Sequence, residues 1–323
     1  LWNTKLIFPD LGADDRVRVN TIKGQRGNII DRNGEMLAGE GVASSVGFVP
    51  GKMADEHEGD VEKAALLLET TSEAICKKLN ASYVKPDMFI PIKTIASGQD
   101  ELEGKLLEIQ GIKITNIPVR YYPFGEGASH ITGYVQNVSA EDLEKLQGYC
   151  ASSIIGKTGL EGIYDESIQG IDGYEIIIVN EAGEKKSSVA SKPAVNGETI
   201  KLTIDGRLQN MLYESLKKDK AAAVAMNPET GEILALISTP SYNANDFVLG
   251  MSQEKWDSLN EDADKPLYNR FKAALVPGSG FKPVIGAIGL STGSFLADED
   301  FGPSSRSWQK DGSWGKYKIT TLK

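Results

Sequence analysis

The sequence holds few of the residues that build metal sites or disulfides. It has two cysteines, Cys76 and Cys150, and two histidines, His57 and His130. Two histidines are too few for a His-rich metal site, and the cysteines are too far apart for the spacing of metal ligands. We therefore expect no metal and no cofactor. We also expect two free thiols rather than one disulfide, although neither outcome would decide the compartment.

The sequence also lacks an excess of basic residues and a long apolar run. Its formal net charge is −10, which argues against a nucleic-acid partner because such a protein presents a basic face. Its longest apolar runs, such as "AAAVAM" at 221–226, are too short to cross a bilayer. The opening residues, "LWNTKLIFPDLGADDRVRVN", lack the basic-then-apolar pattern of a secretory signal, so they resemble the interior of a longer protein.

What is present predicts two globular domains. A chain of 323 residues with 40 % hydrophobic residues is longer than one typical core. The pair Asn33-Gly34 predicts a hairpin within 26–41, because both residues tolerate positive φ. Apolar spacing predicts one or two helices within 59–80, and alternation predicts two strands within 173–190. Ser139 and Asp142 form a capping box for a helix over 139–146, which Gly148 would end.

The pattern changes at about 190–198, where we place the domain boundary. Residues 196–205 are expected to form a strand. Residues 206–219 are expected to form an amphipathic helix with one apolar face, made of Leu208, Met211, Leu212 and Leu216. Two apolar strands within 221–238 flank "NPETG" and predict a hairpin.

The stretch "VPGSGFKPVIGAIGL" (276–290) carries the candidate chemistry. Pro277 and Gly278 break the chain, Ser279 can open a helix, and that helix is apolar almost all round, so we expect it to be buried. Ser279 and Lys282 are three residues apart and share one helical face. A serine needs a base to become a nucleophile, and a lysine that loses solvation can be that base because its pKa falls.

Simpler roles remain open for these and other residues. Ser279 can be only a helix cap, and Lys282 only a solvated charge in the first turn. His130 can be a catalytic acid, although a hydrogen-bonded structural histidine is the expectation. Asp31 and Arg32 are expected to pair with each other or with nearby backbone. The stretch "WQKDGSWGKYK" (308–318) interleaves aromatics with lysines, which suits a glycan platform or a loop that covers an exposed edge.

Five blocks follow one another along the chain: "RGNIIDRNGEMLA" (26–38), "RYYPFGEGASHITGYV" (120–135), "LTIDGRLQ" (202–209), "AMNPETGEILALISTPSYN" (225–243) and "VPGSGFKP" (276–283). In this order they resemble the class B penicillin-binding proteins, which are membrane-anchored transpeptidases that cross-link peptidoglycan. The stretches 1–12 and 307–323 further resemble the low-affinity, methicillin-resistance type of the class. By that resemblance the chain would be truncated at both ends.

The resemblance implies an α+β fold, with an elongated mixed pedestal (dimerisation) domain before the N-terminal part of an α/β serine transpeptidase domain. Residues 1–25 would be a linker from a missing N-terminal domain, 26–195 the pedestal, and 196–323 the partial transpeptidase domain. The protein would lie at the extracytoplasmic face of the cell membrane, held by an anchor that this chain lacks. Its partners would be peptidoglycan stem peptides, β-lactam antibiotics and other cell-wall synthesis proteins.

The resemblance also implies a catalytic mechanism. Ser279 would be acylated by the penultimate D-alanine of a stem peptide, with Lys282 as the base, and β-lactams would acylate the same serine. Gly280 departs from the family, which usually has a β-branched or small polar residue there. No Ser-x-Asn follows Ser279 in the sequence, so we expect this fragment to be inactive by itself. The alternatives are a non-catalytic scaffold for cell-wall enzymes and a β-lactam sensor.

The tetrapeptide Gly156-Lys157-Thr158-Gly159 imitates two other signatures. A phosphate-binding loop would need a glycine at position 151, which is alanine. The Lys-Thr-Gly signature of the family follows the nucleophile, whereas this copy precedes Ser279. We therefore expect the N-terminal turn of a helix from Leu160 to about Ile168, with no role in catalysis.

Overall fold

The computed structural model describes every residue except 1–5, 146–148, 151–152, 301, 303–304 and 321–323. The chain divides into two compact units, Leu1–Lys272 and Ala273–Lys323. This division falls inside the range 196–323 that was expected to be one partial domain, and the expected domain ranges stay a prediction. Gly148, the expected helix end, lies outside the described residues.

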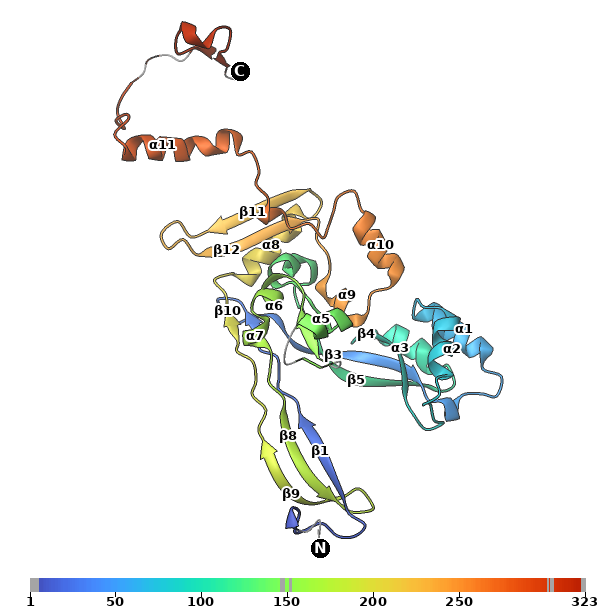
Figure 1. Cartoon of the computed structure of the whole chain (residues 1–323). Helices are drawn as coiled ribbons and strands as arrows, with labels where there is room; N and C mark the ends of the chain where they lie inside the picture. The colour runs from blue at the N-terminus through green and yellow to red at the C-terminus, as the bar shows by residue number, and fades with distance from the viewer. Residues whose placement is uncertain (1–5, 146–148, 151–152, 301, 303–304, 321–323) are drawn as a thin grey trace. The chain divides into compact units, whose positions relative to one another are not determined.

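The first unit mixes short strands and short helices along its whole length (Figure 1). Its strands are β1 (Arg16–Ile22), β2 (Ile29–Ile30), β3 (Met36–Phe48), β4 (Ile90–Ala96), β5 (Ile112–Tyr121), β6 (Val135–Asn137), β7 (Ile154–Gly156), β8 (Gly173–Val179), β9 (Lys185–Lys192), β10 (Ile200–Lys201), β11 (Ala221–Met226) and β12 (Ile233–Thr239). Its α-helices are α1 (Glu58–Leu67), α2 (Ser72–Leu79), α3 (Asp100–Leu107), α4 (Ser129–Thr132), α5 (Ala140–Lys145), α6 (Gly159–Ile163), α7 (Asp165–Ile168), α8 (Gly206–Leu216), α9 (Ala244–Leu249) and α10 (Gln253–Glu261).

Short 3-10 turns complete the first unit, and the second unit has fewer elements. The turns of the first unit are η2 (Pro50–Lys52), η3 (Gly125–Gly127) and η4 (Arg270–Lys272). The elements of the second unit are η5 (Gly278–Phe281), α11 (Lys282–Ser291), β13 (Ser307–Trp308), η6 (Gly312–Trp314) and β14 (Ile319–Thr320).

Strand β3 organises the larger sheet of the first unit. It is antiparallel to β2 at its start, to β5 over Gly39–Phe48 and to β4 over Ala43–Phe48, and β10 pairs in parallel with β2. The β2–β3 pair confirms the predicted hairpin, and Gly34 takes the positive φ of 90° that its turn requires. Helices α1 and α2 confirm the helices predicted within 59–80. They bury apolar side chains against β3 in one cluster, whose buried members are Phe48, Val61, Ala64, Ala65, Ile75 and Ile109.

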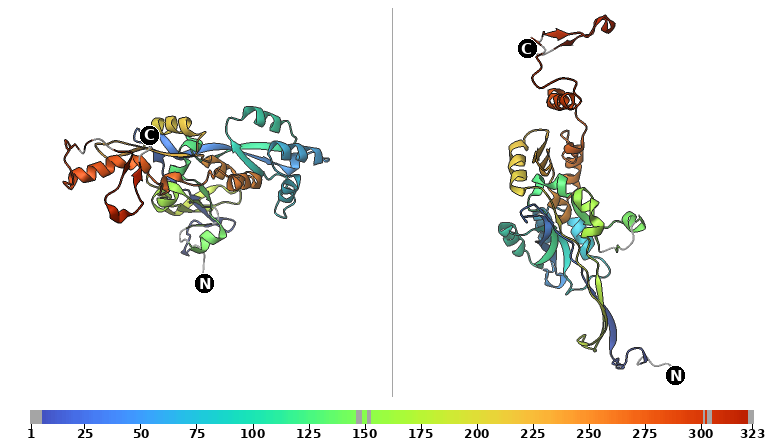
Figure 2. Two further views of the ribbon diagram at one scale, coloured as in Figure 1. Left: turned by 90° about the horizontal axis from the view of Figure 1, so that it is seen from above. Right: turned by 90° about the vertical axis from the view of Figure 1, so that its left-hand side faces the viewer.

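A second, narrow sheet in the order β1–β8–β9 is antiparallel throughout (Figures 1 and 2). Strands β8 and β9 confirm the pair predicted within 173–190, and Gly183 between them has a φ of 84°. Strand β1 lies inside the range 1–25 that was expected to be a linker.

Glycines allow three chain segments to pass close together next to this sheet. The Gly27 N–H donates to the Ile168 carbonyl at 2.7 Å, and the Gly197 N–H donates to the Gln25 carbonyl at 2.9 Å. A Cβ at Gly197 would lie 1.9 Å from the Ile168 carbonyl oxygen, and one at Gly27 would lie 2.0 Å from the Glu198 carbonyl oxygen. These backbones therefore touch where no side chain fits.

Residues 196–205 form less strand than predicted. Only β10, Ile200–Lys201, pairs in a sheet, because the chain then turns to begin α8. The Asp205 side chain accepts hydrogen bonds from the N–H groups of Arg207 and Leu208, which caps that helix.

Helix α8 confirms the predicted helix and part of its predicted face. Leu208, Leu212 and Leu216 are half-buried, but Met211 is 63 % exposed. The buried residues on this side of the helix are Gln209 and Tyr213. The Gln209 amide donates to the carbonyls of Gly127 and Leu236 and accepts from the Leu236 N–H, so a polar residue fastens the helix to β12. The spacing of apolar residues could not predict that Gln209 is buried, because glutamine is polar.

Strands β11 and β12 confirm the predicted hairpin around "NPETG". The Asn227 side chain accepts from the Glu229 N–H at 2.9 Å, and Gly231 has a φ of 75°. Strand β12 packs on a core that also takes side chains from the start of β3 and from α9. Its buried members are Ile29, Leu37, Ala38, Tyr122, Ile131, Ile204, Tyr242, Ala244 and Phe247.

Replacing Gly197 by alanine should destabilise the first unit. The new Cβ would overlap the Ile168 carbonyl, which is backbone and cannot rotate away, so we expect a loss of about 2 kcal/mol or more in urea unfolding. The matched control is Gly104→Ala in α3, where a Cβ meets nothing within 4 Å. That variant should be more stable by about 0.5–1 kcal/mol, because alanine lowers the conformational entropy of the unfolded chain. Equal stabilities of the two variants would contradict the close packing of segments 24–27, 168–173 and 194–198.

Candidate active site

Ser279 lies in a 3-10 turn immediately before a helix. Gly278 has a φ of 53°, which a glycine adopts easily, and η5 then runs from Gly278 into α11 at Lys282. The residues at the cap positions before η5 and before α11 are Pro277 and Phe281. Ser279 lies inside η5 and occupies neither cap position, so the simpler capping role considered for it is wrong.

The backbone brings Ser279 and Lys282 together, but their side chains do not bond. The Lys282 N–H donates to the Ser279 carbonyl. Both residues are described, and no hydrogen bond joins the Ser279 hydroxyl to the Lys282 ammonium group. Both side chains are exposed. Their catalytic roles stay predictions.

Gly280, which departs from the family pattern, is not required by its surroundings. A Cβ at this position would meet no atom within 4 Å, and Gly280 is not among the glycines with positive φ. Within the described residues, the structure gives no steric reason for glycine beside Ser279.

Within the unit Ala273–Lys323, the expectation that the helix after Ser279 is buried is wrong. Val284, Ile285 and Ile288 are 45 %, 55 % and 53 % exposed, and Gly289 is the buried residue of α11. Apolar residues on every side show that a helix surface needs cover, but they do not show which segment supplies it. The described residues of the unit Ala273–Lys323 leave this surface open.

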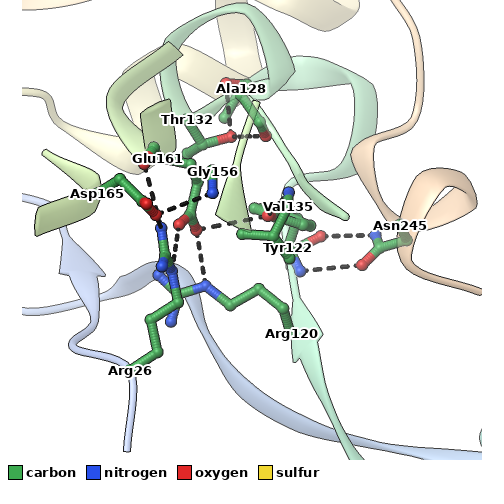
Figure 3. Close-up of polar contacts among 11 residues, drawn as sticks. Arg26, Arg120, Tyr122, Ala128, Thr132, Val135, Gly156, Glu161, Asp165 and Asn245 are labelled. Atoms are coloured by element: carbon green, nitrogen blue, oxygen red, sulfur yellow. Dashed lines mark hydrogen bonds and ion pairs between the residues drawn. The ribbon is translucent and has the colours of Figure 1, made fainter. Parts of the chain in front are cut away.

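A buried group of charges joins distant parts of the first unit (Figure 3). The two Glu161 carboxylate oxygens accept from Arg120 Nε at 2.7 Å and from Arg26 Nε at 2.8 Å. The Glu161 side chain is fully buried, and those of Arg120 and Arg26 are 3 % and 7 % exposed. Arg26 also contacts Asp165, with Nη2 and Oδ1 2.6 Å apart.

Hydrogen bonds from neutral groups complete this cluster. The Tyr122 hydroxyl donates to Glu161 Oε1 at 3.4 Å and accepts from the Val135 N–H at 3.0 Å. The Gly156 N–H and the Tyr149 hydroxyl both donate to Asp165. Burial lowers the pKa of Arg26, but the charges of Glu161 and Asp165 outweigh it and raise that pKa above its ordinary value. The cluster is therefore held as paired charges.

Family profiles match most of the chain. The description "Penicillin-binding Protein dimerisation domain" matches residues 21–202, and "Penicillin binding protein transpeptidase domain" matches residues 221–323. The chain belongs to the class B penicillin-binding proteins. This confirms the predicted class, and also the predicted α+β fold with a dimerisation domain before a transpeptidase domain.

Individual relatives agree with this assignment. The chain is 40 % identical to Penicillin-binding protein 3 of Bacillus subtilis, over 99 % of this chain and 48 % of that protein. It is 31 % identical to the peptidoglycan D,D-transpeptidase MrdA of Escherichia coli K12, over 98 % of this chain and 52 % of that one. The chain therefore spans about half the length of the curated relatives it matches.

A solved structure supports the same fold. The chain resembles a penicillin-binding protein (PBP2) from Helicobacter pylori, solved in complex with MreC, with a TM-score of 0.67 and 31 % identity. The match covers 95 % of this chain and 58 % of that one.

Two of the three buried residues, Arg26 and Arg120, come from blocks that resembled this family, although sequence reasoning did not connect them with Glu161. Arg26 is the first residue of the first block, and Arg120 is the first residue of the second. Glu161 follows the tetrapeptide at 156–159. Each is one charged residue among many in a single sequence. Nothing local marks a charge that will be buried, so only the tertiary structure shows that these three penicillin-binding-protein residues meet.

The tetrapeptide at 156–159 leads into the predicted helix turn. Thr158 precedes α6 in an extended conformation, and Gly159 begins the helix with a φ of 57°. The Lys157 ammonium group contacts Asp142 at 2.5 Å. The helix predicted from Leu160 to about Ile168 is two short helices, α6 and α7, because the chain departs from helical geometry at Tyr164. The absence of a catalytic role stays a prediction.

His130 is the expected hydrogen-bonded histidine. Its Nε2 lies 3.0 Å from the Pro266 carbonyl, which can only accept, so this nitrogen carries the proton. The ring packs edge-on against Tyr242 at 5.1 Å between centroids. Burial lowers the pKa of His130 to about 4, so the ring is neutral near pH 7.

The turn at Asp31 and Arg32 forms partly as expected. Asp31 Oδ1 accepts from the backbone N–H groups of Asn33 and Glu35, and Oδ2 accepts from that of Gly206 at 3.0 Å. Arg32 pairs with Glu232 at 3.5 Å and not with Asp31. Asp31 therefore fastens the first hairpin to the start of α8.

Other features of the described chain bear on cofactors and location. Cys76 is a free thiol, so it forms no disulfide with Cys150. Across the described ranges, no group of three or more His, Cys, Asp or Glu side chains is placed to hold a metal ion. No described helix combines the length and apolarity needed to cross a membrane.

Changing Glu161 to glutamine should destabilise the first unit by about 3–5 kcal/mol, because two buried guanidinium groups lose a charged partner. Urea unfolding measures the change. The matched control is Glu232→Gln, whose partner Arg32 lies 3.5 Å away with both side chains more than a third exposed, and it should cost less than about 1 kcal/mol. A loss at Glu161 no larger than in the control would contradict the role of the buried charges.

Stability should fall as the pH drops from 6.5 to 4, and His130 should cause part of the fall. Its pKa of about 4 in the folded chain lies below its ordinary 6.5, so the unfolded chain binds the extra proton first. The contribution is complete above pH 6.5 and is lost as the pH falls to about 4, about 3 kcal/mol in full. His130→Gln should flatten this part of the curve of unfolding free energy against pH. Parallel curves for parent and variant would refute the assignment.

Proposed function

We propose that the chain supplies the pedestal and the nucleophile of a peptidoglycan D,D-transpeptidase. The observation that carries this is the turn Pro277–Lys282 before an apolar helix, within the stretch that matches the transpeptidase family at 221–323. The names of the relatives support it, because MrdA of Escherichia coli is named a peptidoglycan D,D-transpeptidase.

The proposed reaction passes through an ester on Ser279. Its hydroxyl oxygen bonds to the carbonyl carbon of the penultimate D-alanine, and the bond to the nitrogen of the last D-alanine breaks. Lys282 takes the hydroxyl proton and gives it to the leaving amine. The amine of a neighbouring stem peptide then attacks the ester, forms the cross-link and returns the hydroxyl of Ser279. A β-lactam carbonyl reacts at the same oxygen and leaves an acyl-enzyme.

This mechanism requires Lys282 to be neutral when it accepts the proton. Burial favours the neutral form of a lysine. We infer that the open apolar surface of α11 is covered in the complete protein, since the curated relatives are about twice as long as this chain. The chain by itself, with exposed Ser279 and Lys282 side chains, is then inactive.

The proposed substrate also suggests a location and partners. Peptidoglycan lies outside the cytoplasm, so the protein acts at the extracytoplasmic face of the membrane. The Helicobacter pylori neighbour was solved in complex with MreC, which supports a second cell-wall protein as a partner. Membership of the low-affinity, methicillin-resistance type remains part of the proposal.

The alternatives are a non-catalytic scaffold and a β-lactam sensor. The reading frame of the parent gene distinguishes the transpeptidase from the scaffold. Continuation past Lys323 with Ser-x-Asn and then Lys-[Thr/Ser]-Gly supports the transpeptidase, because these signatures complete the active site. A parent protein without them supports the scaffold.

A β-lactam should add its mass to Ser279 of the full-length protein, because this hydroxyl is the proposed nucleophile. Mass spectrometry of the digested protein locates the adduct, and Ser279→Ala should abolish it. The matched control is Ser294→Ala, which changes an exposed serine of the same unit and should leave labelling intact. The 323-residue chain should be labelled far more slowly than the full-length protein.

Two results would contradict the proposal. An adduct that persists in Ser279→Ala would assign the nucleophile elsewhere. Labelling of the 323-residue chain at the full-length rate would show that the fragment is competent and that no further cover for α11 is needed.

A further inference from the structure

The last segment of the first unit, residues 264–272, carries the chain toward the turn that holds Ser279, and we call it the exit segment. All of its residues are described, and its one regular element is the short turn η4, which packs against β11 and β12. Lys265 has a φ of 49°, in the left-handed region that residues with side chains rarely adopt. Such a conformation persists only where neighbouring contacts hold it. The exit segment therefore needs side chains to keep one conformation.

Arg270 holds the exit segment from within. Its guanidinium group donates to the backbone carbonyls of Lys265 and Tyr268, at 3.2 Å in each case, and also to that of Asp264. Arg270 is 8 % exposed, so these bonds are largely shielded from water. A guanidinium group presents its donors in one plane at fixed angles, and it can therefore hold several carbonyls in one arrangement. The three acceptors all belong to the exit segment, so Arg270 closes this stretch of backbone on itself.

Strand β12 fastens the exit segment to the core of the first unit. The Arg270 N–H donates to the Ser238 hydroxyl at 3.0 Å, and the same hydroxyl donates to the Tyr268 carbonyl at 3.3 Å. Ser238 is buried and lies near the end of β12. One serine thus joins the exit segment to a strand at two points, next to the carbonyls that Arg270 holds.

Helix α4 fastens the same segment as well. His130 donates from Nε2 to the Pro266 carbonyl at 3.0 Å. The Asn269 side-chain amide donates to the His130 carbonyl at 3.4 Å. The exit segment is therefore tied to α4, to β12 and to its own arginine, and its conformation is determined within the first unit.

The course of the chain makes this arrangement relevant to the proposed nucleophile. Residues 273–277 join the exit segment to η5, which contains Ser279. Attack of a serine hydroxyl on a carbonyl carbon requires close contact of the reacting atoms, and a displacement of about 1 Å that begins far from the chemistry can slow such a step by about a hundredfold. A loosened exit segment would release one end of the linking residues. Ser279 would then occupy the reactive position for less of the time.

We propose that Arg270 is a positioning residue for the acylation of Ser279. It holds the exit segment in one conformation and so fixes the point from which the chain continues to the nucleophile turn. The proposal rests on the proposed function, because it takes Ser279 as the nucleophile. The effect passes through the backbone of residues 264–272 and requires no contact between Arg270 and the substrate.

Acylation of the full-length protein by a chromogenic β-lactam, followed by stopped flow, tests this role. Arg270→Met removes every donor of the guanidinium group and keeps most of the length of the side chain. The acylation rate constant at saturating β-lactam should fall by about tenfold or more, because fewer molecules hold the serine in the reactive position. The dissociation constant of the non-covalent complex should stay close to that of the parent, since no binding contact is removed. Arg270→Lys should not restore the rate, because an ammonium group lacks the planar fork.

Gly197→Ala is the matched control, because it should destabilise the same unit without changing the exit segment. With every protein assayed well below its unfolding temperature, this variant should be acylated at the parent rate. Equal slowing of Gly197→Ala and Arg270→Met would overturn the proposal, because the loss would then follow from general destabilisation. Acylation of Arg270→Met at the parent rate would also overturn it.

Ser238→Ala is a milder variant that decides the question if Arg270→Met does not fold. It removes the hydroxyl that bonds to Arg270 and Tyr268 and leaves the guanidinium bonds in place. Acylation should slow by about threefold, which corresponds to one lost hydrogen bond. An unchanged rate in this variant, beside an unfolded Arg270→Met, would reject the positioning role.

The position of the adduct separates this proposal from the proposed catalytic function. Mass spectrometry of the digested protein locates the β-lactam in the parent and in each variant. An adduct on a residue other than Ser279 would reject the nucleophile itself. An adduct on Ser279 that forms in Arg270→Met as fast as in the parent would reject only the positioning role.

Discussion

The Glu161 carboxylate, buried between the guanidinium groups of Arg26 and Arg120, joins three distant segments of the first unit. A carboxylate with no exposure is tolerated only when it is paired, and here each oxygen has its own arginine. The arginines come from the segment before β2 and from the end of β5, and Glu161 comes from α6. Three segments far apart in sequence must therefore meet in one arrangement. Close backbone packing at Gly27 and Gly197 adds to this arrangement beside it.

The candidate active site depends on local backbone geometry rather than on buried charges. A chain break at Pro277-Gly278 and a 3-10 turn put Ser279 one turn before Lys282, and local backbone geometry alone achieves this. Local geometry does not desolvate Lys282 or bring its side chain to the serine hydroxyl. The proposed chemistry needs both. In this family member the first unit is thus held together by buried contacts of its described residues, whereas the proposed catalysis requires another segment to cover α11.

Local signals predicted the elements that local forces build. The hairpin at Asn33-Gly34, the capping of α5 by Ser139 with Asp142, and the hairpin around 227–231 all form, because each is closed by side chains or positive φ within a few residues. Predictions of burial that depend on contacts between distant segments were less accurate. The buried face of α8 contains Gln209, which bonds to Gly127 and Leu236, and no apolar periodicity marks such a residue.

The sequence by itself determined the family, the α+β class, most hairpins and helices, and the spacing of Ser279 and Lys282. These depend on residue identity, on short-range geometry and on ordered blocks that a linear chain displays directly. Only the tertiary structure decided which charges are buried together, that burial lowers the pKa of His130 so that the ring is neutral near pH 7, and that α11 is exposed within its own unit. The reason is physical: burial and pairing are properties of two or more segments in space, and one segment's sequence carries no record of its partner.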